Sequence, residues 1–208
     1  MDSIAGFILV GGKSRRMGTD KSALTLNGQR FVDRIAGEIS GVSSSVTVVG
    51  SNAAALQLKH SRNAAIVPDV YPDWGALGGV HAALAACSAQ RSTQSSPLWA
   101  LVVACDFPFV TKELFVRLAS VREGFEAVAP IQNDSIPQPL CALYRVEPCL
   151  ARAEELIKSG ERKPIALLQS VGTRWILFSE LADLEQADSL FDNINTPQDY
   201  ARIAPERS

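Results

Sequence analysis

The first half of the chain alternates short apolar runs with segments whose apolar residues recur at helical spacing. Continuous apolar runs at residues 4–10 and 98–104 predict strands that are buried on both faces. Further strands are predicted at Ser45–Val49 and Ala65–Val67, and helices at residues 31–39, 52–60, 77–87 and 111–121. Buried strands that alternate with helices are typical of a parallel sheet covered by helices on both faces.

After residue 127 this alternation changes. Strands are predicted at residues 127–130, 139–145 and 175–178, and helices at 148–159 and 165–170 and after Pro197. The polar turn between the first two of these strands predicts an antiparallel strand in the second half. We therefore expect a single three-layer α/β/α domain over residues 1–208, with a mostly parallel, Rossmann-like sheet.

Open α/β sheets bind their ligands beyond the carboxyl ends of the strands. The loops that follow Val10, Val49, Val67 and Ala104 are therefore expected to share one edge of the sheet and to build one site.

Composition narrows the class of protein. The chain has 208 residues, 47% of them hydrophobic, and a net charge of −2, which argues against a general nucleic-acid binder. No apolar stretch reaches the roughly 18 residues that a membrane span needs. The four cysteines lie in apolar surroundings without CxxC spacing, so we expect reduced core thiols and a cytoplasmic protein.

A cationic loop follows the first predicted strand directly, with the sequence "GGKSRRMGTDK" at residues 11–21. Gly11 and Gly12 allow backbone N–H groups to approach phosphate oxygens, Arg15 or Arg16 can clamp two oxygens, and Lys21 adds a point charge. A Walker A loop would need a glycine where Phe7 stands. The alternative is a solvated turn with surface cations, but the position directly after a buried strand favours a phosphate loop.

At these residues the chain resembles the molybdenum cofactor guanylyltransferases, which are nucleotidyltransferases with a sugar-nucleotide-transferase type of fold. Their signature, L-A-x-G-x-S-x-R-M-G followed by lysine, stands here from Leu9 to Lys21, with Val10 in place of alanine. The ending Asp20-Lys21 indicates the guanylyl branch. The resemblance covers about residues 4–203 and is most specific in the first 110 residues.

Two further motifs extend the resemblance. Asp69 and the turn at residues 75–79, which includes Gly78, match an aspartate and a G-P-L-G-G turn of the family, with Ala76 in place of proline. Asp106 matches the D-x-P motif that supplies a ligand to Mg²⁺, and one carboxylate with phosphate and water suits that ion. From the residues alone, Asp69 reads as an ordinary turn acid. The family often carries an asparagine after its second strand, where this chain has Gly50.

The second half resembles the family more loosely. Gln138, Arg162 and Lys163 are candidates to hold the phosphate and pterin of the second substrate, and Asn193 and Asn195 lie in a matching segment. The alternative for Asn195 or its neighbour Thr196 is that it caps the helix that follows.

The resemblance implies transfer of GMP from GTP to the terminal phosphate of molybdenum-loaded molybdopterin, which gives the guanine dinucleotide cofactor and pyrophosphate, with Mg²⁺ as cofactor. Residues 1–125 would be the nucleotide-binding half and 126–208 the acceptor-binding half. Lys21, Arg16 and Asp106 would be catalytic, with Asp106 as the metal ligand. The nucleotide would be bound by Leu9, Val10, Gly11, Gly12, Ser14, Lys21, Gly50, Asp69, Gly78 and Asp106.

The expected partners are these small substrates and, transiently, molybdoenzymes or molybdenum-insertion proteins, with no nucleic acid and no membrane. Two alternatives stay open. One is a CTP-dependent cytidylyltransferase that acts on molybdopterin or another phosphorylated acceptor. The other is a non-catalytic nucleotide-binding partner or chaperone of molybdoenzymes.

Overall fold

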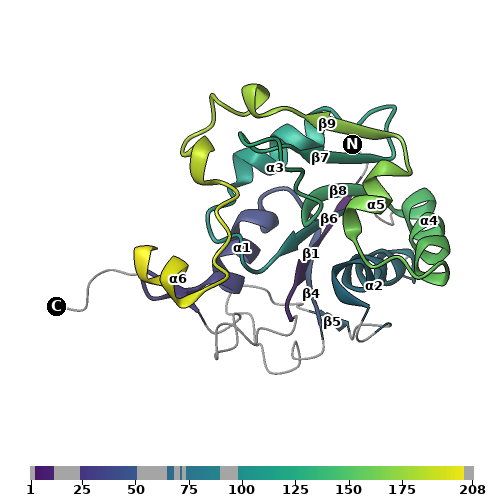
Figure 1. Ribbon diagram of the computed structural model, residues 1–208, viewed down its shortest axis with the longest axis horizontal. Coiled ribbons are helices and arrows are strands. Elements are labelled where there is room, and N and C mark those ends of the chain that lie inside the picture. The colour runs from purple at the N-terminus through teal and green to yellow at the C-terminus, as the bar shows by residue number, and fades with distance from the viewer. Residues whose placement is uncertain are drawn as a thin grey trace.

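A seven-stranded sheet forms the centre of the residues that the computed structural model describes, which are 3–11, 24–50, 65–67, 71, 74–89 and 98–203. The strand order is β5-β4-β1-β6-β8-β7-β9 (Figure 1). The strands are β1 (Ile4–Leu9), β4 (Ser45–Val49), β5 (Ala65–Val67), β6 (Trp99–Ala104), β7 (Ala127–Pro130), β8 (Cys141–Arg145) and β9 (Thr173–Ile176). Only β8 among them runs antiparallel to its neighbours, because β1 pairs in parallel with β4 and β6 while β8 opposes β6 and β7.

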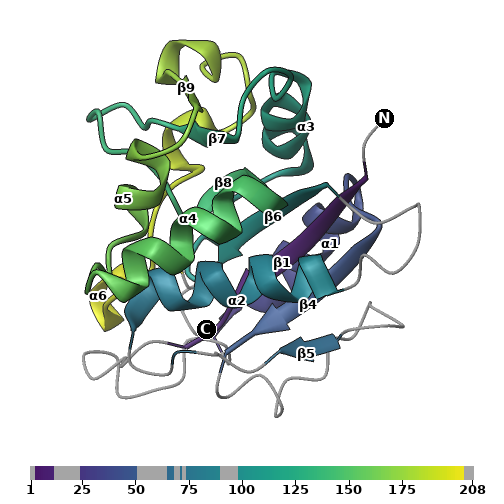
Figure 2. The same cartoon turned by 90° about the vertical axis from the view of Figure 1, so that its right-hand side faces the viewer.

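Helices cover both faces of this sheet (Figures 1 and 2). On one face lie α1 (Phe31–Ser40) and α3 (Lys112–Ser120). On the other lie α2 (Gly75–Ala89), α4 (Val146–Lys158) and α5 (Pro164–Gln169). The predicted three-layer α/β fold with an antiparallel strand in its second half is therefore confirmed.

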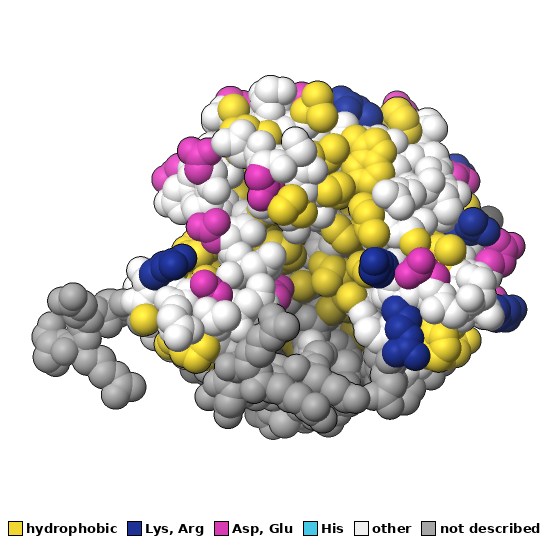
Figure 3. Space-filling view, viewed as in Figure 1, with side chains coloured by type: hydrophobic (Ala, Val, Ile, Leu, Met, Phe, Trp, Pro, Cys, Tyr) yellow, Lys and Arg dark blue, Asp and Glu magenta, His cyan; other side chains and the backbone are white. Residues whose placement is uncertain are grey.

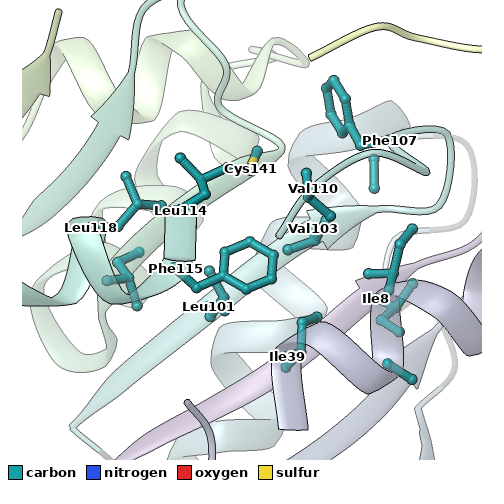
Figure 4. Close-up of a cluster of buried hydrophobic side chains, with 14 of the residues drawn as sticks. Ile8, Ile39, Leu101, Val103, Phe107, Val110, Leu114, Phe115, Leu118 and Cys141 are labelled. Atoms are coloured by element: carbon teal, nitrogen blue, oxygen red, sulfur yellow. The ribbon is translucent and has the colours of Figure 1, made fainter. Parts of the chain in front are cut away.

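The sheet separates two apolar cores, because alternate side chains of a strand point to opposite faces. In β1, Ile4 and Ile8 face α1 and α3, whereas Ala5 and Phe7 face α2. Figure 4 shows the first core, where aliphatic side chains of β1, β6 and α1 meet those of α3. Its labelled members are Ile8, Ile39, Leu101, Val103, Phe107, Val110, Leu114, Phe115, Leu118 and Cys141.

Several elements begin or end elsewhere than predicted. Helix α2 begins at Gly75, so the glycine-rich segment 75–79 forms its first helical turn. Helix α4 begins at Val146, which places Pro148 in its first turn, where the missing N–H of proline is tolerated. Strand β9 ends at Ile176, two residues before the predicted end, and a 3₁₀ turn at Phe178–Glu180 follows. The predicted helix at 52–60 lies outside the described residues.

A β-hairpin precedes α1 and was not predicted. Strands β2 (Thr25–Leu26) and β3 (Gln29–Arg30) pair across Asn27 and Gly28, which both have positive φ values, 51° and 76°. The Asn-Gly pair is the usual signal for such a two-residue turn. The hairpin is covered by the last helix, α6 (Pro197–Ile203), where the Tyr200 hydroxyl donates to the Thr25 carbonyl at 2.8 Å.

Helix α1 approaches β1 closely at Gly6. A Cβ atom at Gly6 would lie 2.2 Å from Cγ2 of Ile39 and 3.1 Å from the Ser45 carbonyl oxygen. At Gly37, on the exposed side of the same helix, a Cβ atom would meet nothing within 4 Å. The glycine in the strand is therefore required by packing, whereas the glycine in the helix is not.

We predict opposite effects when these two glycines are changed to alanine. Gly6→Ala should lower the free energy of unfolding by about 1–3 kcal/mol, because α1 has to shift. Gly37→Ala should raise it by up to about 1 kcal/mol, because alanine is the better helix former. Chemical denaturation of both variants measures the two values. Equal stability of the two variants would contradict the close contact between α1 and β1.

Candidate active site at the carboxyl edge of the sheet

The carboxyl ends of β1, β4 and β6 are joined by backbone hydrogen bonds. Val10 N–H donates to the Val49 carbonyl at 2.8 Å, and Cys105 N–H donates to the Leu9 carbonyl at 3.0 Å. After β1 the chain adds β4 and then β5 on one side of β1, and it returns to form β6 on the other side. The direction in which strands are added therefore reverses between β1 and β6. That switch point is where open α/β sheets form their ligand-binding crevice.

Two glycines with positive φ leave this edge. Gly11 has a φ of 113° and Gly50 a φ of 146°. A Cβ atom at Gly50 would lie 1.8 Å from the Val10 carbonyl oxygen, so any side chain there would displace the end of β1. Position 50 therefore requires glycine for a steric reason that the sequence alone does not reveal. Both glycines present bare backbone beside the predicted nucleotide site.

Asp106 lies in the turn that follows β6. Its neighbours Cys105 and Phe107 are buried in the core, whereas Asp106 itself is partly exposed at the sheet edge. The turn is held from α1, where Arg34 Nε donates to the Pro108 carbonyl at 2.7 Å. The backbone that carries the carboxylate is therefore held by β1 through Cys105 and by α1 through Pro108.

A segment from the C-terminal part of the chain reaches the same turn. Ile194 N–H donates to the Asp106 carbonyl at 3.1 Å, and the rings of Phe191 and Phe107 meet edge to face with centroids 6.5 Å apart. Ile194 is buried, so Asn193 and Asn195 on either side of it are held next to Asp106. The structure brings these two predicted acceptor residues to the predicted metal ligand.

Thr196, and not Asn195, caps helix α6. The Thr196 hydroxyl accepts from Asp199 N–H at 3.1 Å, and the Asp199 carboxylate accepts from Thr196 N–H at 2.9 Å and from Asn195 N–H at 3.2 Å. This reciprocal pair settles the capping question that the sequence leaves open. Capping therefore does not account for the side chain of Asn195.

Gln138 is 6% exposed, and its amide nitrogen donates to the side-chain oxygen of Gln132. Gln132 in turn lines an open cavity of about 340 Å³ at the carboxyl ends of β7 and β9. The other residues that line this cavity are Asn133, Asp134, Phe178, Ala187, Asp188, Phe191 and Asp192. Its carboxylates do not suit a phosphate group, and burial raises the pKa of Asp192 above its usual range.

Figure 3 shows a hollow between the segment 187–196 and α5. Arg162 and Lys163 directly precede α5 in the chain. Both side chains are exposed. The Arg162 carbonyl accepts from Leu77 N–H at 3.4 Å, which places the two cations beside the first turn of α2, close to the buried Gly78. The predicted acceptor cations thus adjoin a predicted nucleotide-binding turn.

Several predicted site residues lie outside the described part of the chain. They are Gly12, Ser14, Arg16, Lys21 and Asp69. Of the predicted nucleotide-binding residues, the structure describes Leu9, Val10, Gly11, Gly50, Gly78 and Asp106. Trp74 was missed by sequence reasoning because it belongs to no motif, although it directly precedes the glycine-rich turn.

The edge suits Mg²⁺ better than a transition metal. No group of three or more His, Cys, Asp or Glu side chains converges within the residues that the structure describes. Mg²⁺ needs fewer protein ligands, because one or two carboxylates suffice when substrate phosphates and water complete its shell. The partly exposed carboxylate of Asp106 fits that requirement.

The family model for the MobA-like NTP transferase domain matches residues 6–173. The chain belongs to this family. Its members are nucleotidyltransferases, so the chain is an enzyme of that class. The match begins at Gly6 within β1, includes the Asp106 turn and the Arg162–Lys163 pair, and ends at the first residue of β9.

Curated relatives match nearly the whole length of this nucleotidyltransferase. The probable molybdenum cofactor guanylyltransferase of Pelotomaculum thermopropionicum is 32% identical, over 98% of this chain and 94% of the relative. The molybdenum cofactor guanylyltransferase of Vibrio cholerae is 28% identical, over 94% of this chain and 89% of the relative.

Solved structures share the fold. Molybdopterin-guanine dinucleotide biosynthesis protein A from Archaeoglobus fulgidus aligns with a TM-score of 0.76 and 27% identity, over 96% of each chain. A cytidylyltransferase from Thermus thermophilus, which acts on 2-C-methyl-D-erythritol 4-phosphate, has a TM-score of 0.67 at 15% identity, over 98% of this chain and 97% of its own. The latter likeness concerns the fold alone.

The cysteine side chains lie in the core of the described structure. All four cysteines are buried, reduced thiols, as predicted. Burial raises the pKa of Cys141 far above its ordinary value and that of Cys149 to about 12. Among the helices of the described ranges, none combines the length and apolarity that crossing a bilayer requires.

We predict that the native protein reacts slowly with Ellman's reagent at neutral pH. Thiolates are the reactive species, and burial keeps these thiols protonated and inaccessible. In denaturant all four cysteines should react at once. Rapid labelling of one thiol per native chain would show an accessible thiolate and would contradict this structure.

Proposed function

We propose that this nucleotidyltransferase transfers GMP from GTP to the terminal phosphate of molybdopterin and releases pyrophosphate. The observation that carries the proposal is the match to molybdenum cofactor guanylyltransferases over 94% or more of this chain. The arrangement at the sheet edge supports it, because Asp106 and the bare backbone of Gly11 and Gly50 lie at the carboxyl ends of neighbouring strands, and the cation pair adjoins the first turn of α2.

The triphosphate would be held by the loop that follows β1. In this proposal the backbone N–H groups of Gly11 and Gly12 and the side chains of Ser14 and Arg16 bind its oxygens, and Lys21 neutralises charge at the α-phosphoryl group. Phosphoryl-type transfers depend mostly on positioning and charge neutralisation, so no protein nucleophile is needed. The buried thiols agree with such a direct displacement.

Asp106 would hold a Mg²⁺ ion, which when bound supplies positive charge to the triphosphate. The turn around Asp106 is fixed by Arg34 on one side and by Ile194 on the other. A carboxylate held in place in this way loses little freedom when the substrate arrives, which is the condition for effective electrostatic stabilisation.

The base and ribose would lie between Gly50, Asp69 and the first turn of α2. Leu9 and Val10 form the strand end beneath, and a side chain at Gly50 would disturb Val10. Gly78 is buried within the first turn of α2, where the absence of a side chain lets a flat base approach the backbone.

The acceptor would enter from the C-terminal half. Arg162 and Lys163 suit its phosphate, whereas the carboxylates of the cavity at the carboxyl ends of β7 and β9 would repel phosphate. Asn193 and Asn195 would contact the acceptor beside Asp106, and Gln138 would act through Gln132 at the cavity wall. In this proposal residues 1–125 bind the nucleotide and residues 126–208 the acceptor, within one domain.

The reduced thiols suit a reducing compartment, and we place the reaction in the cytoplasm. Delivery of the product would involve transient contact with molybdoenzymes or molybdenum-insertion proteins.

Pyrophosphate release tests the reaction directly. The purified protein, supplied with each nucleoside triphosphate, should release pyrophosphate with GTP and only when molybdopterin is present. A higher rate with CTP would replace the guanylyl assignment by a cytidylyl one. Nucleotide binding without any release would instead favour a non-catalytic partner of molybdoenzymes.

Asp106→Asn and Lys21→Ala test the assigned roles. Each should lower kcat/KM by about 100-fold or more, the usual effect of removing one group that stabilises developing charge. Asp106→Asn should in addition raise the Mg²⁺ concentration needed for half-maximal activity. Asp183→Asn is the control, because Asp183 pairs with Arg117 on the surface. Unchanged release in both site variants would contradict the mechanism.

A further inference from the structure

Trp74 joins the beginning of α2 to the segment between α4 and α5, 87 residues further along the chain. Its indole Nε1–H donates to the Glu161 carbonyl at 2.8 Å. Its ring lies beneath the guanidinium group of Arg162, whose Cζ atom is 4.8 Å from the ring centroid. Figure 2 shows the α4–α5 connection beside the first turn of α2.

The backbone makes a second link between the same two segments. Leu77 N–H, in the first turn of α2, donates to the Arg162 carbonyl at 3.4 Å. Gly75 has a φ of 68°, and the Arg162 carbonyl oxygen is 3.8 Å from where its Cβ would lie. The glycine-rich turn and the cation pair are therefore in direct contact.

Glu161 holds the backbone of Arg162 and Lys163, which follow it directly in the chain. One oxygen of its carboxylate accepts from Arg162 N–H at 2.8 Å and from Lys163 N–H at 2.9 Å. These hydrogen bonds hold the pKa of the carboxylate below its ordinary value. The segment 161–163 is thus ordered both by its own acid and by Trp74.

Trp74 is itself restrained. The backbone N–H of Trp74 donates to the Tyr71 carbonyl at 2.9 Å, and the centroids of the two aromatic rings are 6.4 Å apart. Tyr71 packs edge to face on the buried His81 of α2, at 5.0 Å between centroids. Trp74 is therefore linked through Tyr71 to the buried His81 of α2.

Stacking on tryptophan leaves arginine competent to bind phosphate. The guanidinium group of Arg162 lies over the indole ring, and an arginine held on an aromatic face can still present N–H groups to phosphate oxygens. A stacked guanidinium also loses less freedom when a phosphate binds, because it is already oriented.

We propose that Trp74 is a positioning residue, which orients Arg162 and Lys163 to receive the phosphate of the acceptor beside the nucleotide-binding turn. This inference rests on the proposed function, because it needs an acceptor phosphate. Nothing in the sequence motifs assigns Trp74, and it acts through Arg162 without touching the reacting atoms.

Steady-state kinetics of pyrophosphate release tests this role. Trp74→Leu should raise the KM for molybdopterin by about 5- to 20-fold, while the KM for GTP and kcat change by less than about threefold. Trp74→Phe keeps a ring beneath Arg162 but removes the indole donor, so it should lie between Trp74→Leu and the wild type. Equal rises in both KM values, or an unchanged acceptor KM, would overturn the proposal.

Coupling to Arg162 separates positioning from packing. Arg162→Ala should raise the acceptor KM at least as far as Trp74→Leu does, and the double variant should add little further. If the factors by which the two single substitutions raise the acceptor KM multiply in the double variant, Trp74 acts by another route and the proposal is overturned. If Trp74→Leu does not fold, the same comparison made with Trp74→Phe decides.

Hydrogen exchange tests whether Trp74 orders the segment around Arg162, independently of whether the proposed reaction occurs. Amides of residues 159–163 should exchange faster in Trp74→Leu than in the wild type, with or without substrates. If the wild type releases no pyrophosphate from GTP and molybdopterin, the proposed function fails, and faster exchange still supports the ordering of Arg162 by Trp74. Unchanged exchange overturns that ordering even if the enzyme is active.

Discussion

Strand β1 lies between β4 and β6, and its carboxyl end is hydrogen-bonded to both of them. The bonds from Val10 to Val49 and from Cys105 to Leu9 fix where each of the three strands stops. Gly50 and the Asp106 turn take their positions from those ends. The close approach of α1 at Gly6 and the buried side chains of both cores hold β1 in this register. A shift of β1 would therefore move Gly50 and the Asp106 turn, two parts of the proposed nucleotide site, together.

The C-terminal half contributes to the same edge through backbone contacts. Ile194 reaches the Asp106 carbonyl, and the Arg162 carbonyl receives the Leu77 N–H at the start of α2. These two contacts bring residues far apart in sequence to one place, which is what a two-substrate transfer requires, because the reacting phosphates have to be aligned.

The sequence predicts the centre of the fold well because its signal there is local. Continuous apolar runs become β1 and β6, and Thr111, at the start of the predicted helix 111–121, caps α3 by accepting from Leu114 N–H at 3.3 Å. The β2–β3 hairpin was missed although Asn27-Gly28 carries its signal. The start of α4 was misjudged because Pro148 suits any position of a first turn.

The candidate site is predictable only where a motif marks it. Asp106 is recognised from D-x-P, but its link to Ile194 depends on tertiary contact between distant segments. Likewise, the sequence leaves Asn195 and Thr196 as equal candidates for the helix cap, and only the geometry selects Thr196. Trp74 has no motif at all, and its meaning comes from Glu161 and Arg162 across the chain.

The central claim is that this MobA-like enzyme joins GMP to molybdopterin, and mass spectrometry of the reaction product tests it most directly. Incubation of the purified protein with GTP, Mg²⁺ and molybdopterin should yield one new species, whose mass equals molybdopterin plus a guanylyl group joined through a pyrophosphate linkage. Recovery of unchanged molybdopterin, or of a product that carries cytidylyl when CTP is also present, would contradict the account.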